Sequence, residues 1–255
     1  MSIAPRLFDG QVAVVSGAGQ GLGEAFAQAL AGAGCQVAVA DINPKEAEAV
    51  AASIRAEGGR SQAFVLDVRD AAACKAMAAQ VAATMGPAAV VVNNAGISTR
   101  AQLDDDNFNF EIDRVMDVNL KGVLNLTRAF IPQLKETKGS VVNVASIAAL
   151  LASFASVPYA ASKGAVAQAT KFLARDLAEH GVRVNAIAPG FVITPLTATL
   201  QDGPGSRMDR AAQRTMFKRV AMPDDLTGPL LFLASDMSKY VTGLVLPVDG
   251  GYSSS

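Results

Sequence analysis

The sequence predicts an α/β protein in which a mostly parallel, doubly wound sheet carries helices on both faces. Between Val12 and Val92, short apolar runs alternate with helix-like segments, which is the pattern of a parallel sheet wound by helices. Hydrophobic residues make up 51% of the chain, enough for a sheet that is covered on both sides. No linker rich in Ser, Pro or Gly divides the sequence, so we expect residues 1–255 to form a single domain.

A glycine-rich segment follows the first predicted strand, Gln11–Val15, and precedes a helix-like run. Its spacing is Gly17-x-x-x-Gly21-x-Gly23. This is not the G-x-G-x-x-G dinucleotide fingerprint, because Leu22 stands where that pattern needs its third glycine. Free backbone N–H groups and the helix dipole at such a turn favour an anion, so we expect a pyrophosphate site here. A glycine loop that only makes a tight turn is the alternative.

The second predicted strand, Gln36–Ala40, ends at Asp41. A carboxylate about 20 residues after the glycines is placed to accept hydrogen bonds from an adenosine ribose. It would also repel a 2′-phosphate, so NAD is the expected cofactor rather than NADP. Asp41 could instead cap the helix that starts at Pro44, but Asn43 is the better cap and leaves Asp41 free.

Tyr159 and Lys163 stand four residues apart, and Ser146 lies 13 residues before Tyr159. Residues four apart share one face of a helix, so the Lys163 ammonium can lie beside the phenol and lower its pKa. The phenol then becomes a usable proton donor and acceptor nearer neutral pH. The spacing alone is weak evidence, because Tyr and Lys fall four apart by chance in many helices.

Together these features resemble the short-chain dehydrogenase/reductase family over nearly the whole chain. The glycine segment is similar to the family's cofactor loop, with Ser16 where Thr is usual. The family's catalytic tetrad is matched by Ser146, Tyr159, Lys163 and Asn119. The resemblance implies a seven-stranded Rossmann-type sheet with helices on both faces.

The resemblance also implies a site for a nicotinamide dinucleotide. Asp67-Val68, after the predicted strand 62–66, looks like the adenine-contacting pair, and the turn Asn93–Gly96 matches the family's Asn-Asn-Ala-Gly turn. The loop 189–194 looks like the segment that seats the carboxamide. The cofactor-binding residues are therefore expected to be Gly17, Gln20, Gly21, Leu22, Gly23, Asp41, Ile42, Asp67, Val68, Asn94, Ala95, Gly96, Tyr159, Lys163, Pro189, Gly190, Val192 and Thr194.

Hydride transfer between a nicotinamide and a carbon bearing oxygen is the reaction that the resemblance implies. Tyr159 would give its proton to a carbonyl oxygen or take one from an alcohol, and Ser146 would hold the same oxygen. Lys163 would bond the nicotinamide ribose and lower the pKa of Tyr159, and Asn119 would keep a water that links Lys163 to solvent. The alternative roles are a strand-end hydroxyl for Ser146 and a polar kink in mid-helix for Asn119.

The expected substrate is a neutral, fairly hydrophobic ketone or secondary alcohol, because no Arg or Lys evidently faces the walls of the site. The segment at about 194–219 is expected to form a lid with a Gly-Pro-Gly hinge. Arg207, Arg210 and Arg214 on this lid leave an acyl-CoA or carrier-bound substrate open. The residues expected to bind substrate are Ser146, Ala148, Phe154, Tyr159, Leu196 and Leu200.

Several other classes of site are disfavoured. The net charge is −1, from 22 Lys and Arg against 23 Asp and Glu, so we expect neither nucleic acid nor an anionic membrane as a partner. Cys35 and Cys74 have no Cys or His neighbour at metal-ligand spacing, so we expect no metal and reduced, buried thiols. Residues 1–9 lack the apolar core of a signal peptide and no long apolar span is evident, so we expect a cytoplasmic protein. His180, the only histidine, precedes Gly181 and is interpreted as the end of a helix.

Three functions remain open from the sequence. The leading one is an NAD-dependent secondary-alcohol dehydrogenase or ketone reductase. The second is a 3-oxoacyl thioester reductase or 3-hydroxyacyl dehydrogenase of the same fold. The third is a non-catalytic dinucleotide-binding regulator, against which the complete set of Ser146, Tyr159 and Lys163 argues.

A homotetramer or homodimer is the expected assembly. The predicted helix Val157–Glu179 carries small residues in close succession, and Phe172 lies on a side away from Tyr159. This surface is more apolar than that of a solvated helix. In the family that the chain resembles, such helices form a symmetric contact between subunits.

Overall fold

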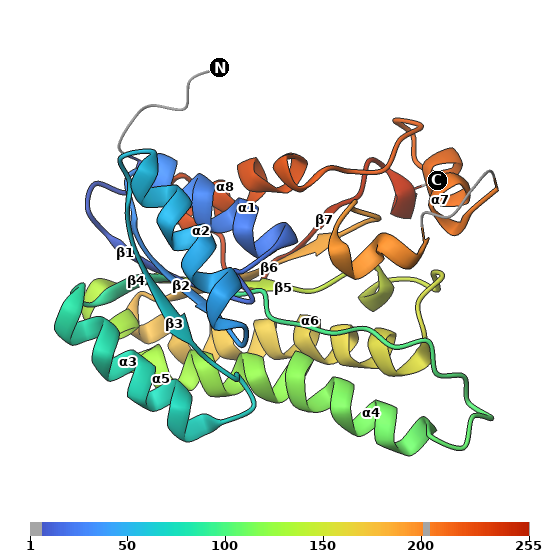
Figure 1. Cartoon of the computed structure of the whole chain (residues 1–255), viewed down its shortest axis with the longest axis horizontal. Helices are drawn as coiled ribbons and strands as arrows, with labels where there is room; N and C mark the ends of the chain where they lie inside the picture. Colours follow the sequence, from blue (N-terminus) through green and yellow to red (C-terminus); the bar gives the residue numbers. More distant parts are fainter. Residues whose placement is uncertain (1–6, 201–204, 255) are drawn as a thin grey trace.

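In the computed structural model, residues 7–200 and 205–254 are described, and strands alternate with helices along them (Figure 1). The strands are β1 Val12–Ser16, β2 Gln36–Asp41, β3 Arg60–Val65, β4 Ala88–Asn93, β5 Ser140–Val144, β6 Arg183–Pro189 and β7 Val245–Val248. The α-helices are α1 Gly21–Gly32, α2 Pro44–Ala56, α3 Ala71–Thr84, α4 Phe108–Met116, α5 Gly122–Thr137, α6 Val157–Leu177, α7 Arg207–Arg214 and α8 Thr227–Ala234.

The described strands form one seven-stranded sheet in the order β3-β2-β1-β4-β5-β6-β7, and every neighbouring pair is parallel. Helices α1, α2 and α8 cover one face, while α3, α4, α5 and α6 cover the other (Figure 1). The predicted doubly wound α/β fold is therefore confirmed. The chain runs outward in opposite directions from β1 and from β4, and in such a sheet the crevice at this switch point is where ligands bind.

Both faces of the sheet are buried, as the near-continuous apolar composition of the strands requires. Successive strand residues point to opposite faces: Val12 and Val14 pack with α3, α5 and α6, whereas Ala13 and Val15 pack with α1, α2 and α8. The expected burial of Cys35 and Cys74 is confirmed. Burial raises the pKa of the Cys35 thiol to about 12.

One long segment of the second helical layer is not a regular α-helix. Between α4 and α5 the backbone forms a π-helical turn, Asp117–Lys121, with the fully buried Asn119 at its centre. Such π turns occur often at functional sites. The alternative interpretation of Asn119 as a mid-helix irregularity is therefore correct as a description of the backbone.

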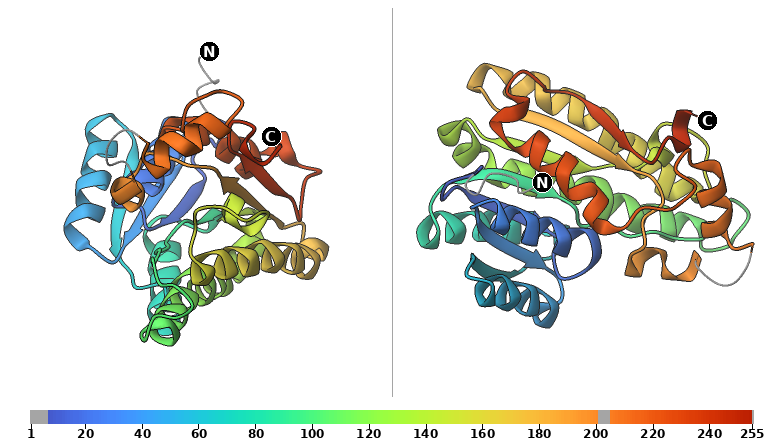
Figure 2. Two further views of the ribbon diagram at one scale, coloured as in Figure 1. Left: turned by 90° about the vertical axis from the view of Figure 1, so that its right-hand side faces the viewer. Right: turned by 90° about the horizontal axis from the view of Figure 1, so that it is seen from above.

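The C-terminal part of the chain closes one end of the molecule. The predicted lid contains a 3-10 segment, Pro195–Leu200, and α7, and the side chain of Leu200 lies outside the described residues. Figures 1 and 2 show α7 beside the C-terminus, where the Met216 N–H donates to the Gly250 carbonyl. Within residues 7–200 and 205–254, no helix combines the length and apolarity needed to span a membrane.

Candidate active site

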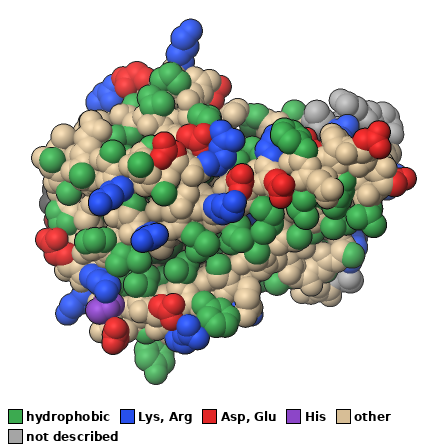
Figure 3. All heavy atoms as spheres, turned by 90° about the horizontal axis from the view of Figure 1, so that it is seen from below, with side chains coloured by type: hydrophobic (Ala, Val, Ile, Leu, Met, Phe, Trp, Pro, Cys, Tyr) green, Lys and Arg blue, Asp and Glu red, His purple; other side chains and the backbone are tan. Residues whose placement is uncertain are grey.

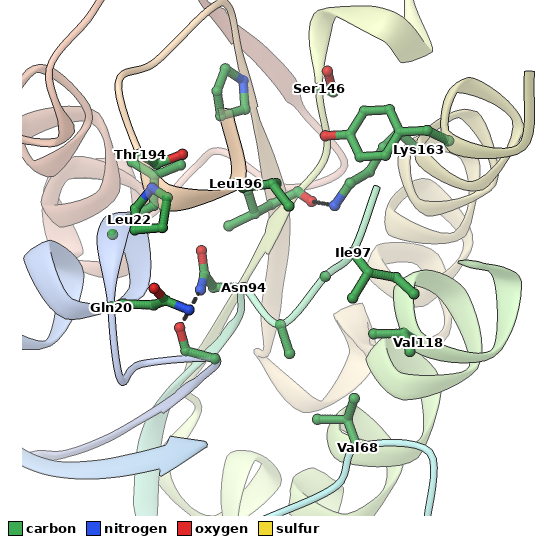
Figure 4. A pocket seen from close by; sticks show the side chains of 18 of the residues that line it. Gln20, Leu22, Val68, Asn94, Ile97, Val118, Ser146, Lys163, Thr194 and Leu196 are labelled. Carbon is green, nitrogen blue, oxygen red and sulfur yellow. Dashed lines mark hydrogen bonds between the residues drawn. The ribbon is translucent and has the colours of Figure 1, made fainter. Parts of the chain in front are cut away.

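A cavity of about 620 Å³ opens over the carboxyl ends of the central strands, within the size range of small-molecule and cofactor sites. Every predicted cofactor-binding residue lines it except Gly23, which is buried behind the glycine loop. Figure 4 shows Gln20, Leu22 and Asn94 on one side of this cavity and Ser146 and Lys163 on another. The structure therefore brings together residues that are more than 140 positions apart in the sequence.

The glycine loop is shaped by close approaches that only glycine allows. Gly17 has a φ of +60°, and a Cβ built there would lie 2.8 Å from the Cα of Ala95. A Cβ on Gly23 would collide with the carbonyl oxygen of Gly17. At the start of α1, Gln20 occupies the N-cap position without a side-chain capping bond. The first N–H groups of the helix therefore point toward the cavity as an anion site.

The turn after β4 holds this loop in place. The amide nitrogen of Asn94 donates to the carbonyl oxygens of Ser16 at 3.0 Å and Gly17 at 2.9 Å. The Ser16 hydroxyl in turn accepts from the backbone N–H groups of Asn94 and Ala95. Ser16 thus supplies the hydroxyl that Thr usually supplies in the family, and these hydrogen bonds form with either residue.

Asp41 lies at the tip of β2, buried against the glycine loop. One carboxylate oxygen accepts from the Gly19 N–H at 2.9 Å, and the other accepts from the Asn43 N–H at 2.9 Å. Asp41 does not cap α2, as expected, but both of its oxygens already have a backbone donor. Asn43 does cap α2, since its side chain accepts from the Lys45 N–H. Asp41 still lines the cavity, and each carboxylate oxygen can accept a further hydrogen bond.

At the far end of the cavity, Asp67 forms a bidentate pair with Arg69, whose Nη2 lies 2.6 Å from Oδ2. This hydrogen bonding lowers the pKa of Asp67, so the carboxylate is ionised at neutral pH. Val68 is buried beside it, and Leu66 and Arg69 also line the cavity. The adenine-contacting role of Asp67 and Val68 remains a prediction.

Tyr159 and Lys163 lie on one face of α6 and point toward the end of β5. The Lys163 Nζ lies 5.7 Å from the centre of the Tyr159 ring and donates to the Val144 carbonyl oxygen at 2.7 Å. Ser146 directly follows β5, and its hydroxyl lies close enough to the phenol of Tyr159 to lower the pKa of that phenol. The same hydroxyl accepts from the Ala148 N–H at 3.1 Å, so its position is held by the backbone.

Burial sets the protonation of this pair in the protein alone. It raises the pKa of the Tyr159 phenol, and the hydrogen bond from Ser146 opposes this only in part. It lowers the pKa of Lys163 to about 8. A lowered phenol pKa was expected from the helix spacing, and that expectation is wrong for the chain alone, because removal from water disfavours both charged forms. An additional positive charge beside Tyr159 would be needed to favour the phenolate.

The amide of Asn119 is bonded within the protein, and its role in keeping a water remains a prediction. Its Oδ1 accepts from the Ile97 N–H at 2.8 Å, and its Nδ2 donates to the Ile97 carbonyl at 3.0 Å and to the Ser162 hydroxyl at 2.9 Å. A Cβ built on Gly96 would lie 3.3 Å from Oδ1 of Asn119 and 3.5 Å from Nζ of Lys163. Asn119 therefore fixes the loop after β4 against α6 and positions the floor of the site.

A second cavity, of about 400 Å³, adjoins the first at Ser146 and Tyr159, which line both. Ala148, Phe154 and Leu196 line it as predicted. Its aromatic wall is braced by Phe191, whose ring centre lies 6.0 Å from that of Phe154. Sequence reasoning missed Phe191, which follows the Pro-Gly pair of the loop after β6.

The second cavity is also lined by Arg100, Arg114 and Arg207. The expectation that no Arg or Lys faces the substrate is therefore wrong. The three arginines come from the loop after β4, from α4 and from α7, and none belongs to a recognisable motif. Within the described ranges, no three His, Cys, Asp or Glu side chains are close enough together to hold a metal ion.

Comparison with known proteins agrees with this geometry. A family model described as enoyl-(acyl carrier protein) reductase matches residues 17–253. The chain is 36% identical over 247 residues to a 3-oxoacyl-[acyl-carrier-protein] reductase of Thermotoga maritima, covering 95% of this chain and 98% of that protein. It is 38% identical over 246 residues to a D-threitol dehydrogenase of Mycolicibacterium smegmatis, covering 96% and 94%.

Solved structures show the same relationship. A gluconate 5-dehydrogenase from Burkholderia cenocepacia, in complex with NADP and tartrate, superimposes with a TM-score of 0.93 at 36% identity, and the match covers 98% of each chain. A match of this extent at this identity goes beyond a shared sheet topology. The chain belongs to the short-chain dehydrogenase/reductase family, as a member of the classical type.

Proposed function

We propose that the protein is an NAD-dependent oxidoreductase that transfers a hydride between NAD(H) and a secondary alcohol or ketone. The observation that carries this proposal is the position of the Tyr159 phenol and the Ser146 hydroxyl, which both line the junction of the two cavities. A substrate oxygen placed at this junction meets both a proton donor and a polarising hydroxyl. The hydride itself is supplied or accepted by the nicotinamide when the dinucleotide is bound.

In the reducing direction, the carbonyl carbon of the substrate receives the hydride and its oxygen receives the Tyr159 proton. Ser146 holds the oxygen during this transfer. Once the phenol has given up its proton, the Lys163 ammonium stabilises the phenolate. The hydrogen bond from Lys163 to the Val144 carbonyl oxygen keeps the ammonium at the site. In the oxidising direction, the phenolate takes the proton of the alcohol while the hydride leaves the carbinol carbon, so charge and atoms balance.

Asp41 supports a preference for NAD over NADP. Its carboxylate lines the dinucleotide cavity at the tip of β2, and the next residue, Ile42, is apolar and 62% exposed. A 2′-phosphate at this tip would meet the negative charge of Asp41, and such a juxtaposition is a means of rejecting one ligand in favour of another. The structurally similar gluconate 5-dehydrogenase was solved in complex with NADP, so the preference for NAD is proposed from Asp41 of this chain and not from its relatives.

A 3-oxoacyl thioester reductase is the second candidate function. It is favoured by the relative from Thermotoga maritima and by the arginines of α7, of which Arg207 lines the second cavity and Arg210 lies 5.5 Å from the ring centre of Phe154. Cations at the mouth of a cavity would attract a phosphorylated carrier arm.

One panel separates these candidates. Ketones, secondary alcohols and 3-oxoacyl thioesters are offered with NADH, NADPH and their oxidised forms, and turnover is followed by nicotinamide absorbance. The proposal expects turnover of a small ketone or its alcohol, faster with NAD(H). A thioester substrate with higher kcat/KM than any small ketone would favour the second candidate, and absence of turnover with the whole panel would contradict both.

We also propose that the protein forms a symmetric assembly, either a homodimer or a homotetramer. Phe110, Leu124, Val157 and Phe172 are exposed on α4, α5 and α6, and Figure 3 shows hydrophobic side chains gathered across the face of the molecule seen from below. Apolar surface of this kind typically marks a contact between chains. Light scattering at micromolar concentration tests it, and a mass near the 26.2 kDa of one chain would contradict it.

A further inference from the structure

Three arginines from three separate parts of the fold face one small cavity. Arg100 lies in the loop after β4, Arg114 in the last turn of α4, and Arg207 at the start of α7. Among the described residues that line this cavity there is no aspartate or glutamate. A cavity lined by charges of one sign concentrates ligands of the opposite sign.

Arg114 is held in place by a single carboxylate. Its Nη2 lies 2.6 Å from Oε2 of Glu111 one turn earlier, and hydrogen bonds from Arg114 and Thr99 lower the pKa of Glu111. The Nε of Arg114 is buried and has no hydrogen-bond acceptor in the described structure. A buried N–H without an acceptor costs free energy. The Arg114 guanidinium therefore has a donor left for a bound ligand.

Two of the three arginines lie outside the dinucleotide cavity. Arg100 and Arg207 line only the second cavity, whereas the anion site at the start of α1 lies in the first. Arg114 lines both cavities where they meet, as Ser146 and Tyr159 do. An anionic group bound by these side chains would therefore be part of the molecule whose oxygen reaches the Tyr159 phenol.

From this arrangement we infer that the substrate carries a carboxylate, and that Arg114, Arg207 and Arg100 are the residues that select it. This inference rests on the proposed hydride transfer and names the substrate class: a small oxo acid and its hydroxy acid. The planar guanidinium fork matches a carboxylate with two parallel hydrogen bonds. Ser98, Thr99 and Ser153 also line the cavity and offer partners for further hydroxyl groups.

The first test compares the reduction of each oxo acid with that of its uncharged methyl ester. A series of oxohexanoates that carry the ketone at successive carbons, each beside its methyl ester, is reduced with NADH. We expect at least one acid to have a kcat/KM roughly 10- to 100-fold above that of its ester, the value of one charge-assisted hydrogen bond. Equal or faster reduction of every ester would overturn the inference, as would a clear preference for dihydroxyacetone phosphate over every oxo acid.

The second test removes the arginines one at a time as Arg114→Met, Arg207→Met and Arg100→Met. Each is expected to lower the acid-to-ester ratio of kcat/KM, by about tenfold for Arg114→Met. Arg55→Met is the matched control, because Arg55 lies on α2, far from the cavity, and pairs with Glu48 on the surface. If Arg114→Met does not fold, Arg207→Met at the exposed start of α7 decides the question. An acid-to-ester ratio that no variant changes would overturn the inference.

A binding measurement separates this inference from the proposed reaction. The protein with NADH bound is titrated with hexanoate and with hexanamide, which cannot be reduced, and NADH fluorescence is followed. Tighter binding of hexanoate, lost in Arg114→Met and Arg207→Met, would support carboxylate recognition even if no ketone were turned over. Turnover of neutral ketones without any preference for hexanoate would leave the reaction standing and overturn the carboxylate assignment.

Discussion

The two cavities that meet at Tyr159 are built in different ways. The larger one is lined by the start of α1, by glycines at close approaches, and by the carboxylates of Asp41 and Asp67. The smaller one has no carboxylate among its described lining residues and carries three arginines and the aromatic pair Phe154 and Phe191. The first cavity suits the nicotinamide dinucleotide that the whole family binds. The second cavity can be altered by replacing one side chain at a time.

The difference shows where stability and specificity are located in this fold. In the first cavity a single added methyl group would strike backbone, because Gly17 and Gly23 contact main-chain atoms directly. In the second cavity many lining residues come from loops and helix ends, where substitution changes charge or size without altering the sheet. The predictions that follow test this contrast, beginning with the junction itself.

The largest effect is expected at the junction of the two cavities. Tyr159→Phe keeps the ring and removes the hydroxyl that donates the proton, so kcat should fall by on the order of 10² or more, the range of a lost general acid. NADH affinity, measured by fluorescence titration, should change little. Near-normal turnover by this variant would contradict the assignment of Tyr159 as the catalytic acid and base.

The first cavity should tolerate no added atom behind the glycine loop. Gly23→Ala would place a methyl group against the Gly17 carbonyl, and such overpacking costs about 1–3 kcal/mol of stability and displaces the loop. Gly32→Ala is the control on the same helix, where an added Cβ meets nothing within 4 Å and the change should be neutral or stabilising by up to ~1 kcal/mol. Urea unfolding and NADH titration of both variants measure this; equal stability of the two would refute the packing argument.

Cofactor preference should depend on a single charge in the first cavity. Asp41→Asn removes the negative charge at nearly constant shape, so the ratio of kcat/KM with NAD to that with NADP should fall by roughly tenfold or more. Asn43→Ser is a suitable control, since it keeps a capping side chain on α2 and leaves the carboxylate unchanged. A ratio that is the same in wild type and Asp41→Asn would show that the carboxylate does not select the cofactor.

The smallest predicted effect is a pH dependence of stability from Lys163, whose pKa is lowered from 10.5 to about 8 by burial. Between these values the unfolded chain binds more protons than the folded chain, so the free energy of unfolding rises with pH, by at most about 1.36 kcal/mol per unit. Below about pH 8 the penalty of the buried ammonium is complete. Lys163→Met lacks this contribution, so its stability relative to wild type should be greatest near neutral pH and decrease toward about pH 10.

The measurement is urea unfolding of both proteins without nucleotide across this range. The buried cysteines titrate in both proteins and cancel in the difference. Parallel stability profiles would show that Lys163 keeps its ordinary pKa in the folded chain. Such a result would contradict the conclusion that the junction at Tyr159 and Lys163 is shielded from water.

Much of the first cavity was predictable because its residues are grouped in short segments. The strand, glycine turn and helix around Gly17, and the strand end at Asp41, are local patterns whose geometry follows from a few neighbouring residues. The Asp41 hydrogen bonds with Gly19 and Asn43 were not predictable in the same way, since they depend on how the loop settles against β2. The protonation of Tyr159 also depends on burial that helix spacing does not reveal.

The sequence by itself determined the α/β order of elements and the glycine loop, because hydrophobic periodicity and short-range spacing encode these features directly. The Ser146, Tyr159 and Lys163 set was identified from the sequence through its family resemblance. Only the tertiary structure decided the character of the second cavity. Arg100, Arg114 and Arg207 lie on separate elements, and a charged residue on a loop or helix end has the same local pattern whether it faces solvent or a substrate. Which of these it faces is set by how the sheet brings the loop after β4, α4 and α7 together at one end.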